Sequence, residues 1–518
     1  MQNIYFNLVL HSHLPFVKKA GRWPFGEEWF FEAMLETYIP LSMVFYNLKN
    51  KGIDWHITLG VTPVLAEQLS DAYMIYETEK YIEEKISLAE KDYYEFSKKE
   101  KKEAEVAKFY KRHYQEILNA FRNIFSRNVL KFWRELQKDG NLEILTSSAT
   151  HAYLPLLKKS SSVYAQLYIG KENYKKHFGE EPVGVWLPEC AYKPGLEKFL
   201  SELNLKYFFV DAHSILGEES LGYPEFKSPE NGRSILSPYY VSDSEIVVFG
   251  RHQKTSMQVW SADWGYPGDG VYREFHKKAE SSGLQYWKIV SKNLDLGKKE
   301  IYEPEVAKNK ALEHANHFVS LLEEEGKKDK GIITAMYDTE LFGHWWFEGL
   351  IFLERVYELI SESQIVKSIT PTLYLSIYPP KDRINISESS WGKGGKHEVW
   401  LNKDTEELWR KIYLVEDTME EIIEREEVNS LWKEKLLKQM AREKLLLESS
   451  DWPFLITTHQ AQDYGYKRFY QHFENFLNLS DLLKIKEPSV EAFNILKKLE
   501  ETDSLFPNID YKVFRRRE

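Results

Sequence analysis

Seven short β-type runs recur along this chain, and helical stretches separate them. Each run ends in polar or charged residues, a pattern typical of parallel strands whose functional side chains lie at the carboxyl ends. The chain is therefore predicted to form an α/β fold with a barrel-like sheet. The runs cover residues 3–13, 54–61, 142–151, 183–189, 205–213, 256–264 and 331–340.

Two longer segments interrupt these runs. Residues 64–138 carry apolar side chains at helical spacing, which predicts a helical insertion between the second and third strands. Residues 216–240 contain Gly, Pro, Ser and Glu without periodicity, which predicts a loop excursion over the sheet end. Residues 404–449 are expected to form a long amphipathic helix. We expect a catalytic barrel domain over residues 1–395 and a C-terminal helical domain, contributing to the cleft, over residues 396–518.

The composition excludes several classes of protein. With 80 acidic and 69 basic residues, the formal net charge of −11 repels nucleic acid and anionic membranes, so neither is an expected partner. The single cysteine, Cys190, excludes an internal disulfide and a multi-cysteine metal site. We expect no signal peptide, no membrane span and a cytoplasmic location. The oligomeric state is not specified, and a monomer is compatible with the sequence.

Aromatic residues are abundant, with 15 Trp, 32 Tyr and 29 Phe. Such rings can stack on the apolar C–H faces of sugars, and they can equally well form a Tyr-rich core. Both interpretations stay open on composition alone.

Two histidines, His11 and His13, end the first run. Because alternate residues of a strand point to the same face, both rings could enter one cavity. As a zinc site they would need a further ligand, which His151, His213 or Asp211 could supply. The alternative is that both histidines hydrogen-bond a polar ligand.

Two carboxylates, Glu189 and Asp338, end two later runs. One carboxylate that attacks an anomeric carbon and one that donates and then accepts a proton are the minimum equipment for glycosidic cleavage with retention. The alternative for either acid is that it caps a following helix.

Eight motifs resemble those of glycoside hydrolase family 57, and within it the group of 1,4-α-glucan branching enzymes that includes AmyC-type α-amylases. The motifs extend from residue 11 to residue 454, so the resemblance covers most of the chain. They are HSHLPF (11–16), ETYIPL (36–41), EILTSSATHAYLPLL (143–157), WLPECAY (186–192), QVWSADWGYPGDGVYREF (258–275), YDTELFGHWWFEG (337–349), SSWGKGGKHEVWLN (389–402) and SSDWPF (449–454).

The resemblance implies a distorted (β/α)7 barrel with an inserted helical subdomain and a C-terminal helical domain. It assigns Glu189 as the nucleophile and Asp338 as the general acid/base, and it implies neither a metal nor another cofactor. His151 and His344 could orient the carboxylates or bind hydroxyls, or serve as structural histidines. By motif match the substrate contacts are Arg251, Gly268, Trp391 and Asp451, and the cleft-lining residues are His11, His13, Trp23, Trp29, Trp260 and Trp400.

The implied mechanism is a double displacement in which the acceptor decides the product. Transfer to a 6-hydroxyl makes an α-1,6 branch, and transfer to water makes the enzyme an amylase. We expect a branching enzyme with appreciable hydrolysis, acting on amylose, glycogen-like polymer and maltooligosaccharides. The alternatives are a hydrolytic α-amylase or 4-α-glucanotransferase, a metal-dependent deacetylase built on His11 and His13, and a non-catalytic glucan-binding protein, against which the two carboxylates argue.

The sequence departs from the branching group at two positions. His252 follows the Gly-Arg of the FGR motif where relatives commonly carry an acidic residue, and Trp264 stands in SADWGYPG. The shielding of the intermediate from water is expected to depend on the 216–240 loop, where Tyr223, Tyr239 and Tyr240 are available.

The sequence also predicts the surroundings of four further residues. Cys190 is expected to pack rather than react. Trp345 and Trp346 are expected to split, one ring facing the cleft and the other the core. Trp391 is expected to stack on glucose.

Overall fold

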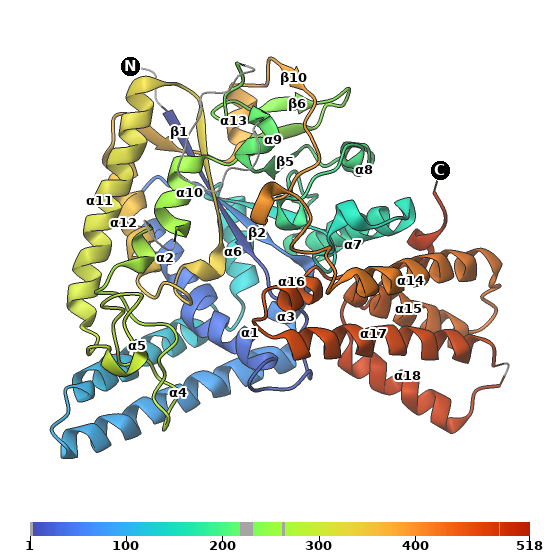
Figure 1. Ribbon diagram of the computed structural model, residues 1–518, viewed down its shortest axis with the longest axis horizontal. Helices are drawn as coiled ribbons and strands as arrows, with labels where there is room; N and C mark the ends of the chain where they lie inside the picture. The colour runs from blue at the N-terminus through green and yellow to red at the C-terminus, as the bar shows by residue number, and fades with distance from the viewer. Residues whose placement is uncertain (1–3, 218–231, 262–264, 486, 518) are drawn as a thin grey trace.

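The computed structural model describes residues 4–217, 232–261, 265–485 and 487–517. It shows an α/β body in which most of the strands lie, and a layer of C-terminal helices on one side of it (Figure 1). Within the described residues, no helix has both the length and the apolar character that crossing a bilayer requires.

Two sheets form the α/β body. The first has the strand order β4-β3-β2-β1-β8, with β9 also paired to β1, and all of these pairings are parallel. The second has the order β10-β6-β7-β5. The strands are β1 Ile4–Ser12, β2 Ile57–Val61, β3 Leu142–Ser147, β4 Val185–Trp186, β5 Tyr207–Val210, β6 Tyr239–Val241, β7 Val247–Gly250, β8 Ile332–Asp338, β9 Val366–Ser368 and β10 Arg383–Ile384.

Backbone contacts at two places join the two sheets and close a distorted seven-stranded barrel. Gly184, beside β4, pairs in parallel with Tyr207 of β5. On the other side the backbone N–H of His252 donates to the carbonyl of Thr334 in β8 at 2.8 Å. The strands of the ring are β1, β2, β3, β4, β5, β7 and β8, so the expected distorted (β/α)7 barrel is confirmed.

One of the seven predicted strands is wrong. Residues 256–260, predicted to begin a strand, belong to the helix α10 (Gln253–Trp260), and residues 262–264 lie outside the described residues. The ring of His252 accepts a hydrogen bond from the backbone N–H of Thr255 and so caps this helix. The apolar residues Met257 and Val259 occupy alternate positions, and this alternation led to the prediction of a strand. The sixth strand of the barrel is β7, whose four residues are all buried.

The segment predicted as an insertion contains long helices between β2 and β3. Asp71 caps α4 by accepting hydrogen bonds from the N–H groups of Tyr73 and Met74. In α5 the buried residues recur at helical spacing, and α4 and α5 pack along each other at the lower edge of the molecule (Figure 1). The helices are α3 Pro63–Ser70, α4 Ala72–Lys98, α5 Glu103–Asn119 and α6 Val129–Lys138.

The C-terminal region contains five helices in its described part. The single long helix expected over residues 404–449 is two helices, because the chain breaks at residues 426–430 and Ser430 caps the second helix. The domain limits predicted at residue 395 and around the insertion stay predictions. The helices are α14 Glu406–Arg425, α15 Leu431–Leu447, α16 Asp451–Thr457, α17 Gln462–Leu483 and α18 Val490–Thr502.

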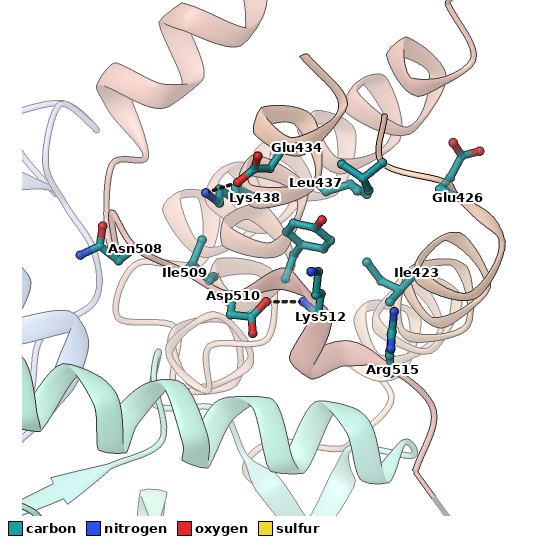
Figure 2. Close-up of a pocket in the computed structure, with 12 residues that line it drawn as sticks. Ile423, Glu426, Glu434, Leu437, Lys438, Asn508, Ile509, Asp510, Lys512 and Arg515 are labelled. Atoms are coloured by element: carbon teal, nitrogen blue, oxygen red, sulfur yellow. Dashed lines mark hydrogen bonds and ion pairs between the residues drawn. The ribbon is translucent and has the colours of Figure 1, made fainter. Parts of the chain in front are cut away.

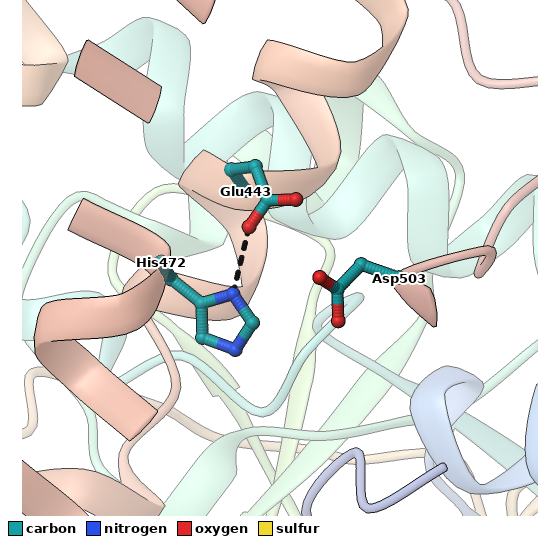
Figure 3. Close-up of side chains that lie close together, drawn as sticks. All are labelled: Glu443, His472 and Asp503. Atoms are coloured by element: carbon teal, nitrogen blue, oxygen red, sulfur yellow. Dashed lines mark hydrogen bonds and ion pairs between the residues drawn. The ribbon is translucent and has the colours of Figure 1, made fainter. Parts of the chain in front are cut away.

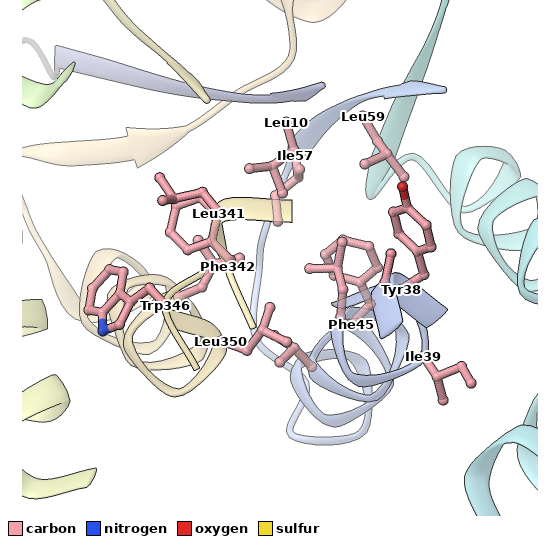
Figure 4. Packing of buried hydrophobic residues seen from close by; sticks show 14 of the residues in the cluster. Leu10, Tyr38, Ile39, Phe45, Ile57, Leu59, Leu341, Phe342, Trp346 and Leu350 are labelled. Atoms are coloured by element: carbon pink, nitrogen blue, oxygen red, sulfur yellow. The ribbon is translucent and has the colours of Figure 1, made fainter. Parts of the chain in front are cut away.

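The remaining helices cover the barrel. Figure 4 shows how α2 and α12 pack against β1 and β2 through buried apolar side chains, among them Phe45, Leu59 and Leu350. Phe342 and Trp346 join the same cluster, so the segment that follows β8 is held against the core. These helices are α1 Glu27–Ala33, α2 Ile39–Asn50, α7 Ser160–Phe178, α8 Leu196–Glu202, α9 Ala212–Leu216, α11 Pro304–Lys328, α12 Gly349–Glu362 and α13 Pro371–Ile377.

Candidate active site

The two carboxylates predicted from the sequence lie at the carboxyl ends of barrel strands. Asp338 is the last residue of β8, and its Cα pairs with that of His11 in β1. Glu189 follows β4 in the short turn Pro188–Cys190, with φ 61° and ψ 24°. His151, after β3, also has a positive φ of 59°. Non-glycine residues are strained in this region, and such strain is concentrated at functional sites.

The Glu189 carboxylate is held by the loop that carries Trp391. The indole Nε1–H of Trp391 donates to Glu189 Oε2 at 2.7 Å, and the backbone N–H of Trp391 donates to the Glu189 carbonyl at 3.0 Å. Burial raises the pKa of Glu189 to about 8. Hydrogen bonding by Trp391 and Ser450 opposes this rise, whereas the charges of Asp338 and Asp451 add to it.

Asp338 shares the electrostatic field of the same pocket. Burial raises its pKa to about 6, and the nearby charges of Arg251 and His13 oppose the rise. Because the two carboxyl groups interact, they titrate as a pair. The pair therefore keeps one proton between about pH 6 and pH 8, which leaves one carboxylate and one carboxylic acid.

Three histidines from the ends of β1 and β3 stack beside the carboxylates. The ring of His151 lies 3.8 Å from that of His13 and 5.0 Å from that of His11, centroid to centroid. His11 Nε2 and His151 Nε2 are 3.0 Å apart, and His151 Nδ1 is 2.8 Å from Ser450 Oγ. Burial lowers the pKa of both His11 and His151 well below the usual value, so these two rings are neutral.

The third histidine, His13, connects the barrel to the C-terminal region. Its Nε2 lies 3.1 Å from both carboxylate oxygens of Asp451, and its Nδ1 lies 3.0 Å from Thr62 Oγ1. Asp451 begins α16 and therefore belongs to the C-terminal helices. His11 and His13 thus face one site, and their rings stack with centroids 6.1 Å apart.

Arg251 and Trp391 form the opposite side of the site. The Arg251 guanidinium carbon lies 5.5 Å from the centre of the Trp391 ring. Arg251 Nε donates to Ser256 Oγ at 2.8 Å, and its Nη1 lies 3.7 Å from Asp211 Oδ2. The half-buried ring of Trp391 packs edge-on against Trp186. These contacts place Arg251 and Trp391 beside the carboxylates, and their predicted role as substrate contacts stays a prediction.

Trp400 does not line an open cleft, so its predicted role is wrong. Its side chain is only 1% exposed and stacks on Tyr153 at 4.4 Å. A Cβ added at Gly392 would meet the Trp400 ring at 2.6 Å, so the indole packs directly under the loop that carries Trp391. Trp400 supports that loop from the core.

His344 is tied to a buried ion pair. Its Nδ1 lies 2.9 Å from Glu36 Oε2, and Glu36 Oε1 accepts from Arg273 Nη1 at 2.7 Å. Although burial favours the neutral acid, the charge of Arg273 and hydrogen bonding hold the pKa of Glu36 at about 2. This carboxylate stays charged and holds the His344 ring in place, so the predicted role of His344 at the carboxylates stays a prediction.

Four other residues that were predicted to contact substrate or line the cleft interact with other parts of the protein. Trp23 is 77% exposed and Trp260 is 38% exposed. Trp29 packs on Phe25 and Tyr464, and Gly268 ends a short 3-10 turn. Within the described residues, no direct contact ties these four to Glu189 or Asp338, so their roles stay predictions.

Sequence reasoning missed two partners of the site. Ser450 contacts His151, and Glu340 accepts hydrogen bonds from Tyr38 and from the backbone N–H of His13. Burial raises the pKa of Glu340 to about 8, and the neighbouring charge of Asp338 adds to the rise. The motifs ETYIPL, YDTEL and SSDWPF already contained these residues, but motif membership did not reveal their contacts.

His252, which departs from the branching group, and two tyrosines expected in the 216–240 loop have structural contacts, and both tyrosines lie in β6. His252 caps α10, and burial lowers its pKa to about 4, which leaves its ring nitrogen free to accept. Tyr239 hydrogen-bonds the backbone of Ser234, and Tyr240 lies under the guanidinium of Arg383. Tyr223 and Trp264 lie outside the described residues.

Cys190 is fully buried. It packs in an apolar cluster with Trp186 and Phe209. Burial raises the pKa of its thiol well above the usual value, so the thiol is unreactive, in agreement with the expected packing role.

One group of buried side chains in the described residues has the composition of a metal site. Glu443, His472 and Asp503 bring potential ligand atoms within 4.8 Å of one another, in the C-terminal helices (Figure 3). However, Glu443 Oε1 accepts from Gln439 at 2.9 Å, and Glu443 Oε2 lies 2.8 Å from His472 Nδ1. Both oxygens already have donors, so the group forms a hydrogen-bonded network between α15, α17 and the end of α18.

A pocket of about 610 Å³ also lies in the C-terminal helices (Figure 2). Charged side chains such as Glu434, Lys438 and Arg515 line it together with Tyr511. None of the predicted site residues belongs to this lining, so the pocket is separate from the carboxylate site.

Comparison with known proteins gives a consistent result over the whole chain. The family model described as "Glycosyl hydrolase family 57" matches residues 7–387, and the model described as "1,4-alpha-glucan branching enzyme, C-terminal" matches residues 411–514. A 1,4-α-glucan branching enzyme of Thermococcus kodakarensis is 44% identical, over 97% of this chain and 77% of the relative.

Two solved structures share the fold across the full chain. A crystal structure of a branching enzyme from Thermococcus kodakaraensis, in complex with glucose, has a TM-score of 0.94 at 42% identity and covers 100% of this chain and 97% of that chain. The α-amylase AmyC of Thermotoga maritima has a TM-score of 0.87 at 34% identity, and the match covers 100% of both chains.

Proposed function

The chain belongs to glycosyl hydrolase family 57, and we propose that it is a 1,4-α-glucan branching enzyme in which Glu189 is the nucleophile and Asp338 the general acid/base. The observation that carries the assignment of roles is the pair of interacting buried carboxyl groups at the ends of β4 and β8. Both the similarity to branching enzymes and the match to their C-terminal region support the acceptor specificity.

In the first displacement, a Glu189 oxygen attacks the anomeric carbon of an α-1,4 link. The bond from that carbon to the 4-oxygen of the next glucose breaks, and Asp338 donates its proton to the departing oxygen. The products are a glucan chain with a new 4-hydroxyl and a glycosyl ester on Glu189.

In the second displacement, the carboxylate of Asp338 takes a proton from a 6-hydroxyl of an acceptor glucan. The acceptor oxygen bonds to the anomeric carbon and the ester bond to Glu189 breaks, so both carboxyl groups return to their starting states. Two inversions give net retention, and the new link is an α-1,6 branch.

One contact favours this division of roles, and the order of the two pKa values opposes it. The indole N–H of Trp391 donates to a Glu189 oxygen, and it therefore stabilises the anion needed for attack. No hydrogen-bond donor contributes to the pKa of Asp338, where burial outweighs the charges of Arg251 and His13. The pKa of Glu189, about 8, nevertheless lies above that of Asp338, about 6, so the single proton of the pair resides mainly on Glu189 in the free enzyme. The proposed roles require this proton on Asp338 when substrate is bound.

The remaining polar groups of the site are proposed sugar contacts. Arg251, His13 and Asp451 present charged or hydrogen-bonding groups around the carboxylates, and the half-buried Trp391 ring can stack on a glucose unit. Neutral His11 and His151 keep the far wall of this site free of positive charge.

A hydrolytic α-amylase is the second candidate, because AmyC resembles this chain at 34% identity over its full length. Both reactions share the first displacement, so only the acceptor separates them. Incubation with amylose, followed by counting of new α-1,6 links by NMR and of new reducing ends, decides between them. We expect new α-1,6 links in excess of new reducing ends. A product with new reducing ends and no α-1,6 links would refute branching.

Membership of the family argues against the metal-dependent deacetylase built on His11 and His13. The Nε2 atoms of these residues face His151 and Asp451, respectively, instead of converging on a common point. We expect the formation of α-1,6 links to continue unchanged after treatment with a chelator and gel filtration.

A further inference from the structure

Two adjacent tryptophans follow Asp338, and the structure separates them. Trp346 is 1% exposed and packs in the core beside Phe342 (Figure 4), whereas Trp345 is 48% exposed. Trp346 is therefore the ring of the pair that was expected to face the core. An indole that stays half exposed in a segment held against the core needs an explanation, because exposing a large apolar ring to water is unfavourable.

The exposed ring has a fixed partner. Trp345 stacks on Phe275 with ring centroids 4.3 Å apart and ring planes 30° apart. Phe275 comes from a segment 70 residues earlier in the chain, and it also meets His344 edge-on at 5.1 Å. With one face on Phe275, the half-exposed indole presents apolar surface to solvent.

One buried ion pair anchors both members of this stack. Arg273, two residues before Phe275, donates to Glu36 at 2.7 Å and to the carbonyl of His344 at 3.3 Å. His344, one residue before Trp345, also bonds Glu36. The two segments are therefore held in register by the same charges, which keeps the stack rigid without a contribution from a ligand.

The stack lies at the catalytic end of the barrel. The backbone N–H of Trp345 donates to the carbonyl of Glu340 at 3.2 Å, and Glu340 is two residues after Asp338. His276, next to Phe275, has a side chain that is 72% exposed. A flat aromatic face with an exposed imidazole beside it suits a sugar, because the C–H faces of sugars are apolar and their edges carry hydroxyls.

We propose that Trp345 and Phe275 form a second glucan-binding platform, outside the carboxylate pocket, that holds an outlying stretch of an α-1,4-glucan chain. The proposal rests on the proposed function for the identity of the ligand. The platform adds binding energy only for chains long enough to reach from the carboxylates to Trp345. The platform therefore raises the affinity for long glucan chains and leaves the rate of the chemical step unchanged.

The test compares Trp345→Ala, Trp345→Phe and wild type, with Tyr94→Ala as the matched control. Tyr94 is 56% exposed on α4, so its loss removes a similarly exposed ring from another part of the surface. In native gels that contain amylopectin, we expect Trp345→Ala to bind about fivefold more weakly than wild type. Trp345→Phe and Tyr94→Ala should bind nearly as wild type does.

Kinetics provide the second readout. For Trp345→Ala we expect KM for amylose to rise about fivefold with kcat nearly unchanged, and no change with short maltooligosaccharides. Polymer binding and KM equal to those of wild type would overturn the platform. Equal losses in Trp345→Ala and Trp345→Phe would also overturn it, because stacking requires a ring.

The two proposals fail separately. Gel retardation measures glucan binding without turnover, so it tests the platform even if wild type forms no α-1,6 links. Wild type that branches amylose, with Trp345→Ala indistinguishable from it, would refute the platform and leave the proposed function intact.

Discussion

The barrel end and the C-terminal helices each bury carboxyl groups beside histidine rings, yet the carboxyl groups of the two clusters differ in their hydrogen bonding. In the C-terminal cluster, Glu443 accepts hydrogen bonds from Gln439, His472 and Asn475. At the barrel end, burial raises the pKa of Asp338, and the charges of nearby groups oppose this rise. Glu189 accepts a hydrogen bond from Trp391, which lies on a loop.

The backbones of the two clusters differ as well. Glu443 and His472 lie within regular helices, whereas Glu189 has a positive φ in a three-residue turn. A half-buried tryptophan ring also faces Glu189. The comparison teaches that ligand-type residues alone do not identify an active site. Strained backbone, acids with spare acceptor capacity and an accessible aromatic ring do so together.

The largest expected effect comes from neutralising one carboxyl group at the barrel end. Glu189→Gln and Asp338→Asn should each lower kcat on amylose by about 1,000-fold or more, because each side chain takes part in bond making or breaking. Thermal unfolding should show that both variants remain folded. Glu443→Gln is the matched control and should retain activity within about twofold. A comparable loss in that control would remove the contrast between the clusters.

The pH dependence of the reaction sharpens the same contrast. Because the Glu189 and Asp338 pair keeps one proton between about pH 6 and pH 8, kcat/KM should be highest in that window. Below it both groups are protonated and the nucleophile is lost. Above it both are ionised and the acid is lost. We expect kcat/KM to fall about tenfold per pH unit on each side of this window. A flat pH profile of kcat/KM would contradict the assignment of the two carboxyl groups.

An intermediate effect is expected from Trp391→Phe. This variant keeps a ring but removes the N–H that donates to Glu189 at 2.7 Å. We expect kcat to fall about tenfold to a hundredfold, because a donor to a reacting carboxylate is lost. A raised KM with unchanged kcat would show that Trp391 acts by stacking alone.

The smallest effect on catalysis is expected in the C-terminal cluster. Glu443→Ala leaves three donors without an acceptor, so the free energy of unfolding should fall by about 2–4 kcal/mol. Activity below the unfolding transition should stay within about twofold of wild type. Glu434→Ala removes a partly exposed carboxylate from the same helix and should change stability by less than about 0.5 kcal/mol. Calorimetry and the amylose assay together check both variants.

Much of the site could be predicted because its signals are local. A strand that ends in Asp338, or that Glu189 closely follows, is recognisable from its own residues. The apolar face of α14 with Leu408, Trp409 and Ile412 is equally recognisable. Parallel strands present their carboxyl ends at one edge of a sheet, so placing both acids at one site needed no further information.

The tertiary structure alone decided which of these residues meet, and which rings face water. The hydrogen bond between His11 and His151 joins residues 140 positions apart, and Trp345 meets Phe275 across 70 positions. Trp400 reads as a cleft residue in its motif, yet packing under Gly392 buries it. Periodicity records the preference of a segment for one buried face, whereas exposure and contact depend on distant segments that cover that face.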